Sequence, residues 1–178
     1  MIASVEIRIN SMVSAITGTI VPALEGNSFA TEQALLVAGH LQCLRDRLDY
    51  MDEYTRLELL HTISLARKLV DESEGGPETA AATAALKSTL SEAPTVTIAD
   101  VRESQQSLST LIATLIEAQG RDGTSDTVRT STEIVITAET KQSIRDRSFF
   151  SNFGYEDGND EIPTIDSMME DFRTESVS

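Results

Sequence analysis

Residues 34–51 read ALLVAGHLQCLRDRLDYM and carry the clearest structural signal in the chain. Apolar residues recur there at steps of three and four, which is typical of one face of an α-helix. The pattern extends less regularly to residue 70, and neither Pro nor Gly occurs between residues 41 and 73. We expect either one helix of about 45 residues, near 65 Å long, or two helices that bend around 49–52, where Asp52 would cap the second. A helix that long outgrows a small domain, which favours a break or an extended dimer. The apolar positions are Ala34, Val37, Leu41, Leu44, Leu48, Met51, Leu59, Ile63, Ala66 and Val70.

A second apolar stripe precedes this region and predicts a helix over about residues 2–24. Pro22 lies near its end and must kink or terminate it, because proline lacks the backbone N–H of the helical ladder. Gly26 suits a left-handed C-terminal cap, and Ser28 suits the N-cap of the next helix. The stripe consists of Ile2, Val5, Ile9, Met12, Ile16, Ile20 and Leu24.

Three further segments complete the helical pattern. The sequence Ser73-Glu74-Gly75-Gly76-Pro77 is typical of a linker, and Pro77 favours the first position of a short, partly exposed helix over 79–90. Thr97 and Asp100 predict a capped start of the next helix, which Gly120 would end before a mobile loop over 120–125. Its inward residues would be Ile98, Val101, Leu108, Ile112 and Leu115, as Leu86 and Leu90 would be for the helix before it.

Residues 130–147 admit two interpretations. The run Thr132-Glu133-Ile134-Val135-Ile136-Thr137 is β-branched and locally strand-like. Its one candidate partner, residues 95–98, would give only a marginal two-stranded sheet, and a helix continues better into 138–145. We therefore predict a helix and an all-α fold: an antiparallel bundle of four or five helices over residues 1–148, with a linker near 74–77, followed by residues 149–178 as an aromatic hinge and acidic tail.

Charge is distributed unevenly along the chain. The formal net charge is −15, and residues 151–178 contribute eight carboxylates and one cation, Arg173, hence −7. An acidic protein repels nucleic acid phosphates, so we expect no direct binding to DNA or RNA. A basic protein partner or a cationic ligand fits this charge better. The cations Lys141, Arg145 and Arg147 are expected to oppose the acidic tail.

The single cysteine and the lengths of the apolar runs indicate the cellular location of the protein. Cys43 is alone, which excludes an intramolecular disulfide and favours a reducing compartment, and its place in a predicted helix favours a buried small side chain. The least polar run, residues 12–24, is too short to span a bilayer, and no signal peptide is visible. We expect a cytoplasmic protein without membrane contact.

Few residues combine into a pattern that indicates chemistry. Glu58 and His61 lie three apart on one helix face and are the best metal candidates, although two-metal helical proteins use two such pairs and further glutamates. His40 and Cys43 are one turn apart without a predicted pocket or oxyanion hole. No phosphate-binding loop occurs. The sequence therefore predicts no catalytic residues, no cofactor and no metal, with Glu58 and His61 as weak candidates.

The segment after residue 148 is the best candidate for an interaction site. Half of the eight aromatic residues of the chain fall within 149–155, where Gly154 would permit a sharp turn. Apolar residues then follow at the spacing of a helix that lies in a groove, although a segment this short is marginally helical alone. We expect it to dock on its own bundle, on a second copy or on another protein. The candidate partner-binding residues are Phe149, Phe150, Phe153, Tyr155, Ile165, Met168, Met169 and Phe172.

Together these features predict a non-catalytic helical interaction protein, an accessory or regulatory module that forms a homodimer or binds another protein through its tail. The alternative is a ligand- or metal-binding helical bundle with enzymatic activity, around Glu58 and His61 or around Arg145 and Arg147.

Overall fold

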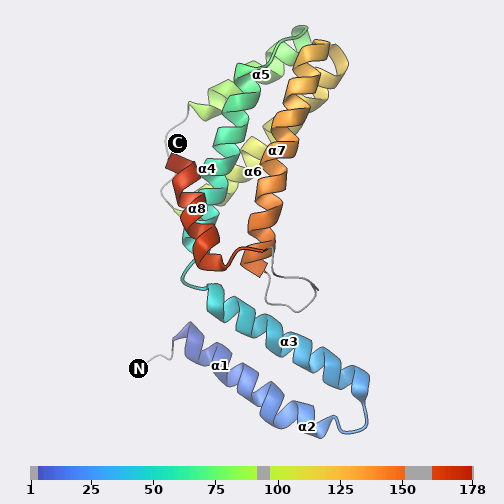
Figure 1. The fold of residues 1–178 in the computed structure, drawn as a ribbon, viewed down its shortest axis with the longest axis vertical. Coiled ribbons are helices and arrows are strands. Elements are labelled where there is room, and N and C mark those ends of the chain that lie inside the picture. Colours follow the sequence, from blue (N-terminus) through green and yellow to red (C-terminus); the bar gives the residue numbers. More distant parts are fainter. Residues whose placement is uncertain (1–3, 92–96, 151–161, 178) are drawn as a thin grey trace. The chain divides into compact units, whose positions relative to one another are not determined.

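The computed structural model describes residues 4–91, 97–150 and 162–177, and every regular element among them is a helix (Figure 1). The expected all-α fold is therefore confirmed. The chain divides into two compact units, one formed by residues 1–51 with 146–165 and the other by residues 52–145 with 166–178. The division runs through one helix, α7 (Ser125–Phe150), after Arg145.

The first unit contains a hairpin of helices. Its first arm is α1 (Val5–Ala15), continued by a π-helical turn, η1 (Ile16–Ile20), and by the single turn α2 (Val21–Ala23). This wider turn ends two residues before Pro22, whose missing N–H interrupts the regular α-helical ladder, and α2 ends one residue after Pro22, as predicted. Gly26 has a φ of 87° and ends the arm as predicted. The expected N-cap at Ser28 is wrong, because Asn27 accepts the hydrogen bond from the Ala30 N–H at 3.0 Å and α3 (Ser28–Arg47) follows it.

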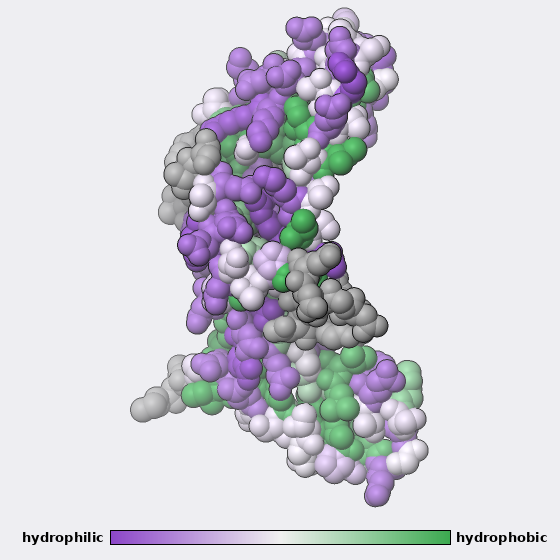
Figure 2. Space-filling view, in the orientation of Figure 1, coloured by the Kyte–Doolittle hydropathy of each residue, from purple (hydrophilic) through white to green (hydrophobic). Residues whose placement is uncertain are grey.

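The core of the hairpin contains part of the two predicted apolar stripes. Ile9, Val13 and Ala38 form this core, with Ile16, Leu41 and Leu48 packed against them, and four of these residues belong to the predicted stripes: Ile9, Ile16, Leu41 and Leu48. Several residues of the predicted stripes are exposed instead, because small side chains on α3 face the first arm; Cys43 is buried as expected. Apolar residues lie at the surface of this unit in Figure 2. The exposed apolar side chains of the hairpin are Val5, Ile7, Met12, Ile20, Phe29, Leu35, Val37 and Leu44.

The long helical region over 28–73 is two helices. The first, α3, ends at Arg47, and α4 (Met51–Asp71) begins four residues later, so the break lies where a bend was predicted. Asp52 lies inside the first turn of α4, and its predicted role as the N-cap is wrong because the helix starts one residue earlier.

The second unit is built around α4, α5 (Pro77–Leu90), α6 (Ile98–Asp122) and the greater part of α7. Leu69, Leu86 and Leu115 are fully buried at its centre, and they come from three different helices. In Figure 1, α4 and α7 lie side by side, and the short helix α8 (Ile165–Val177) lies against them near the start of α4. The remaining core residues are Leu59, Leu65, Ala66, Ala82, Val101, Leu108, Ile112 and Ala118.

Two connections of this unit are tied together. The 73–77 segment joins α4 to α5, and Gly75 forms an isolated antiparallel bridge with Gly123 of the α6–α7 connection. Gly76 has no side chain to cap α5, and the Asp122 carboxylate takes over this role by accepting hydrogen bonds from the Glu78 and Thr79 N–H groups at 2.8 and 3.0 Å. The hydrogen bond from the Thr79 hydroxyl, at 2.6 Å, is the main cause that lowers the pKa of Asp122.

Helices α6 and α7 test four further expectations. The predicted capping box of Thr97 and Asp100 is confirmed. The predicted end at Gly120 is wrong, since α6 continues to Asp122. The predicted mobile loop over 120–125 is also wrong, because only Gly123 and Thr124 separate the helices and the Thr124 N–H donates to the Glu74 carbonyl at 3.1 Å. Residues 130–147 are helical, as predicted. None of the described helices is both long and apolar enough to cross a bilayer.

Candidate functional site

The short helix α8 supplies the apolar anchors of the site. Met168, Met169 and Phe172 are buried, with exposed fractions of 3%, 0% and 1%. They lie on one face of the helix because Met168 and Met169 precede Phe172 by four and three residues, which is about one helical turn. Ile165 is half-buried, whereas Asp166, Glu170 and Asp171 are exposed. The helix therefore divides into an apolar inner face and an acidic outer face.

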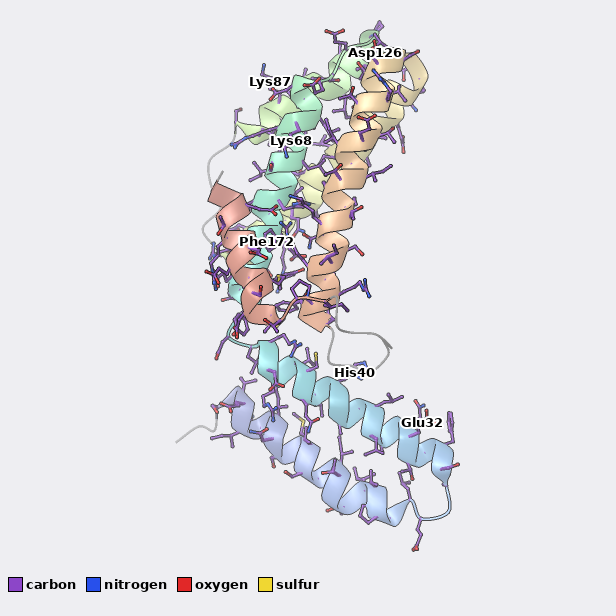
Figure 3. The ribbon with its side chains drawn as sticks, in the orientation of Figure 1. Glu32, His40, Lys68, Lys87, Asp126 and Phe172 are labelled. Atoms are coloured by element: carbon purple, nitrogen blue, oxygen red, sulfur yellow. The ribbon has the colours of Figure 1, made fainter. Side chains whose placement is uncertain are left out.

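Phe172 occupies an aromatic and cationic pocket formed by α4 and α7 (Figure 3). The Tyr54 ring lies edge-on to the Phe172 ring with 5.9 Å between their centroids, and the His61 ring lies edge-on to it with 6.3 Å between centroids. The Arg145 guanidinium from α7 lies over the Phe172 ring at 3.8 Å from its centroid. Edge-on aromatic pairs and a cation over a ring face are both favourable because the ring face is negative and its edge positive. Phe172 is thus the central anchor of α8.

A small ion network lies next to this pocket. Arg145 is 6% exposed and donates to the Glu175 carboxylate of α8 at 2.9 Å, and the Lys141 ammonium reaches the same oxygen at 3.1 Å. Burial by itself raises the pKa of Glu175, but the bond from Lys141 and the charge of Arg145 outweigh it and hold this pKa below its usual value. The expectation that Lys141 and Arg145 oppose the acidic tail is confirmed for Glu175.

Arg173 holds the outer face of α8 to the start of α4. Its Nε and Nη2 atoms reach the two oxygens of Glu53 at 2.6 and 2.8 Å, in a two-pronged geometry. The hydrogen bond from Arg173 is the main cause that lowers the pKa of Glu53. Because both side chains are about half exposed, we expect this pair to orient α8 more than it stabilises it.

His61 is held in its neutral form. Its Nδ1 lies 3.1 Å from Nη1 of Arg145, and because a guanidinium only donates, Nδ1 is the acceptor and the proton is on Nε2. Burial chiefly lowers the pKa of His61, and the positive charge of Arg145 lowers it further. The Nε2 atom is buried without a hydrogen-bond partner among the described residues.

A cavity of about 280 Å³ opens beside this cluster, between α4 and α7. Its charged lining residues are Lys68, Glu133, Lys141 and Glu175, and Leu65, Ile134 and Ala138 supply apolar surface. From the described side chains of α8, Glu175 contributes to the lining. The cavity therefore adjoins the place where α8 is bound.

The metal candidates do not come together with further ligands. Glu58 and His61 share α4 as predicted, but the near neighbour of the His61 Nδ1 is a guanidinium, which repels a metal cation. Across the residues that the structure describes, no group of three or more His, Cys, Asp and Glu side chains could hold a metal ion. His40 is exposed on α3, and its Nδ1 lies 2.7 Å from the Leu36 carbonyl, whereas Cys43 is buried with its pKa raised by burial.

The predicted aromatic segment is only partly described. Phe149 is buried and Phe150 is half exposed, and their rings meet edge-on at 5.2 Å. Arg47 of α3 is buried and donates from Nε to the Phe149 carbonyl at 2.6 Å. This hydrogen bond places a positive charge at a carbonyl group in the last turn of α7, where the helix dipole favours it. Phe153 and Tyr155, also predicted to bind a partner, lie outside the described residues.

Sequence reasoning identified the apolar face of α8 but missed the residues that receive it. Tyr54 and Glu53 lie in the first turn of α4 and carried no signal beyond their helical positions. Arg145 was recognised as a countercharge, yet its burial and its contact with His61 were not foreseen. One signal in the sequence could have predicted this contact. Lys141 and Arg145 lie one helical turn apart, and the tail carries an aromatic residue and a carboxylate three residues apart, Phe172 and Glu175, which could meet such a pair of cations.

No family model matches this chain, and no curated protein or solved structure matches it either. The site combines apolar anchors, a ring between a cation and two aromatic side chains, and ion pairs that hold α8 against α4 and α7. These are the contacts by which one protein helix binds another.

Proposed function

We propose that this chain is a non-catalytic interaction protein, a helical bundle with an acidic docking tail. In this proposal a surface of α4 and α7 binds an acidic amphipathic helix, and α8 occupies that surface in the absence of a partner. The observation that carries the proposal is the position of Phe172 between Tyr54, His61 and Arg145, with Glu175 one turn later on the same arginine.

The size of α8 supports a reversible docking. It has 13 residues, a length at which an isolated helix is marginal in water. Its anchoring depends on three buried side chains, each contributing about 1.5–3 kcal/mol. Because α8 belongs to the same chain as the site that it occupies, a separate partner must compete with an intramolecular contact. The effective concentration of such a contact is on the order of millimolar, which a partner must exceed or circumvent.

Exchange between two copies follows from the same contacts. The α8 helix of a second molecule carries the same Phe172 and Glu175 and can make every contact that α8 makes within its own chain. Such a swap is a common route to a symmetric dimer. We therefore include a homodimer in the proposal, with another acidic helix as the alternative occupant.

Two measurements test this proposal. Light scattering of the full chain over a hundredfold range of concentration reports whether a dimer forms. A fluorescent peptide with the sequence of residues 162–177 is then titrated into the full chain carrying Phe172→Ala, in which the internal competitor is weakened. We expect saturable binding, and weaker binding of the same peptide to the wild-type chain.

A matched peptide in which Phe172 and Glu175 are replaced by Ala and Gln serves as the control. Equal binding of the two peptides, or no binding of the native peptide at millimolar concentration together with a monomeric full chain, would remove the basis of the proposal.

A further inference from the structure

The surface that receives α8 continues into space that α8 leaves open. The cavity between α4 and α7 runs from His61 to Lys68 on α4 and from Lys141 to Thr130 on α7. At 1.5 Å per residue these stretches are about 10 and 16 Å long. Among the side chains of α8 that the structure describes, Glu175 reaches the lining. An occupant that continues the helix beyond the end of α8 would therefore find a preformed surface.

The lining of this cavity indicates what such residues should be. Lys68, exposed on α4 (Figure 3), forms no ion pair with any residue that the structure describes. Lys141 already shares Glu175 with Arg145. Leu65, Ile134 and Ala138 offer an apolar wall on which one aliphatic side chain can lie.

Charge limits the occupant further. The Glu133 carboxylate lines the same cavity from α7. A second carboxylate placed next to it would be repelled, whereas one placed on the α4 side would meet the Lys68 ammonium. The cavity thus suits one acidic and one apolar side chain rather than a polyanion.

We propose that this cavity is the selectivity pocket for a partner helix. The partner is an acidic amphipathic segment that repeats the aromatic and carboxylate spacing of Phe172 and Glu175 and carries one further turn with an aliphatic residue and a carboxylate for Lys68. This inference rests on the proposed function, because it assigns a partner to the site that α8 occupies. The added contacts give a partner an advantage that the α8 sequence over 162–177 lacks, which is what displacement of a tethered helix requires.

Three labelled peptides test the inference by fluorescence anisotropy against the full chain carrying Phe172→Ala. The first has the sequence of residues 162–177, the second adds a turn with one Leu and one Glu, and the third has Gln in place of that Glu. We expect the Glu-extended peptide to bind about tenfold more tightly than the first, and the Gln-extended peptide to lose most of this gain.

Lys68→Glu in the receptor should abolish the tenfold gain and leave the binding of the 162–177 peptide nearly unchanged. Lys87→Glu on α5, which has the same effect on net charge at an exposed position, is the matched control and should keep the gain (Figure 3). If circular dichroism shows that Phe172→Ala does not fold, Arg173→Ala replaces it, since this change removes the exposed ion pair between α8 and Glu53.

The outcomes separate the two proposals. The selectivity pocket is overturned if the Glu-extended peptide keeps its tighter binding to the Lys68→Glu protein, or loses it equally in the Lys87→Glu protein. In either case, binding of the 162–177 peptide still supports the proposed function. Absence of binding by all three peptides overturns both. A Lys68-dependent gain supports the pocket even where the 162–177 peptide binds too weakly to measure.

Discussion

The Arg145 guanidinium lies 3.8 Å from the centroid of the Phe172 ring, and the same side chain reaches both His61 of α4 and Glu175 of α8. One buried cation thereby joins three helices. Its hydrogen-bonding groups face a neutral imidazole and a carboxylate, and its flat face lies on an aromatic ring. Because each of these contacts uses a different part of the guanidinium, they do not compete.

Replacement of Arg145 by Ala should release α8 while leaving the rest of the second unit folded. The loss comprises a cation over a ring and a hydrogen bond to a charged group, together about 2–3 kcal/mol. We expect the amide hydrogens of α8 to exchange roughly 30- to 100-fold faster, measured by hydrogen–deuterium exchange and mass spectrometry. Arg145→Lys should restore little, because an ammonium cannot stack and form two directed bonds at once.

Arg129→Ala provides the matched control on the same helix. Arg129 pairs with Asp126 at 2.8 Å, and both side chains are largely exposed, so we expect exchange in α8 to stay within experimental error of wild type. Equal protection of α8 in the Arg145→Ala and Arg129→Ala proteins would contradict the central role given to Arg145.

Phe172→Ala should have a smaller effect on global unfolding than on α8 itself. Removal of a fully buried Phe commonly costs about 3–5 kcal/mol. Here the helix can instead leave its site, so the global loss is limited to the docking free energy of α8. Urea unfolding should show a modest decrease in midpoint, while limited proteolysis should cleave the chain near α8 much faster.

Phe29→Ala, at a side chain that is 70% exposed, should change neither measurement. Loss of the whole cooperative transition in Phe172→Ala would show instead that α8 is an inseparable part of the core.

The sequence predicts the helices well because each one is specified by its own residues. Thr97 and Asp100 cap α6 from within four positions, Gly26 supplies the left-handed residue after α2, and the break before α4 lies at the bend predicted around 49–52. These signals are local in the chain, so they survive without knowledge of neighbours.

What the sequence does not predict depends on distant residues. Arg145 is an ordinary solvated cation by its position in a polar stretch, and it becomes buried only because His61 and Glu175, 84 and 30 residues away, meet it. The end of α6 moved from Gly120 to Asp122 for a similar reason, since the tie to the 73–77 segment decides where that helix stops. Likewise Val37 and Leu44 share the helical spacing of the predicted stripe, yet they are exposed, because the side of α3 that meets the first arm presents Ala38 together with Leu41 and Leu48.

The free energy of unfolding should decrease as the pH is lowered through about 6, because of His61. Burial and the charge of Arg145 lower its pKa in the folded state, so below its ordinary value near 6.5 the unfolded chain binds more protons than the folded one. The free energy of unfolding should therefore fall as the pH drops from 7 toward 5, and the loss ends once the folded-state pKa has been passed. Glu53 and Glu175 add a separate loss at pH values below about 4.5, where carboxylates with lowered pKa take up protons.

Urea unfolding at pH 7, 6 and 5 measures the contribution of His61. His61→Gln, whose side-chain oxygen can still accept a hydrogen bond from Arg145, should flatten the dependence of the free energy of unfolding on pH in this window. A slope that persists unchanged in His61→Gln would assign the pH dependence to other groups.

Gly76→Ala should destabilise the second unit by displacing the Asp122 carboxylate that caps α5. A Cβ at residue 76 would lie 2.5 Å from Oδ2 and 2.9 Å from Cγ of Asp122, so the carboxylate must move away from the Glu78 and Thr79 N–H groups. We expect a loss of about 1–3 kcal/mol in thermal or urea unfolding. Asp122→Ala removes the same cap, and the two changes should therefore be non-additive, with Gly76→Ala costing much less in the Asp122→Ala background.

Gly120→Ala is the matched control, because a Cβ there meets nothing within 4 Å inside α6, and it should stabilise the protein by about 0.5–1 kcal/mol. Strict additivity of Gly76→Ala and Asp122→Ala would mean that the glycine is required for its backbone and not for the approach of Asp122.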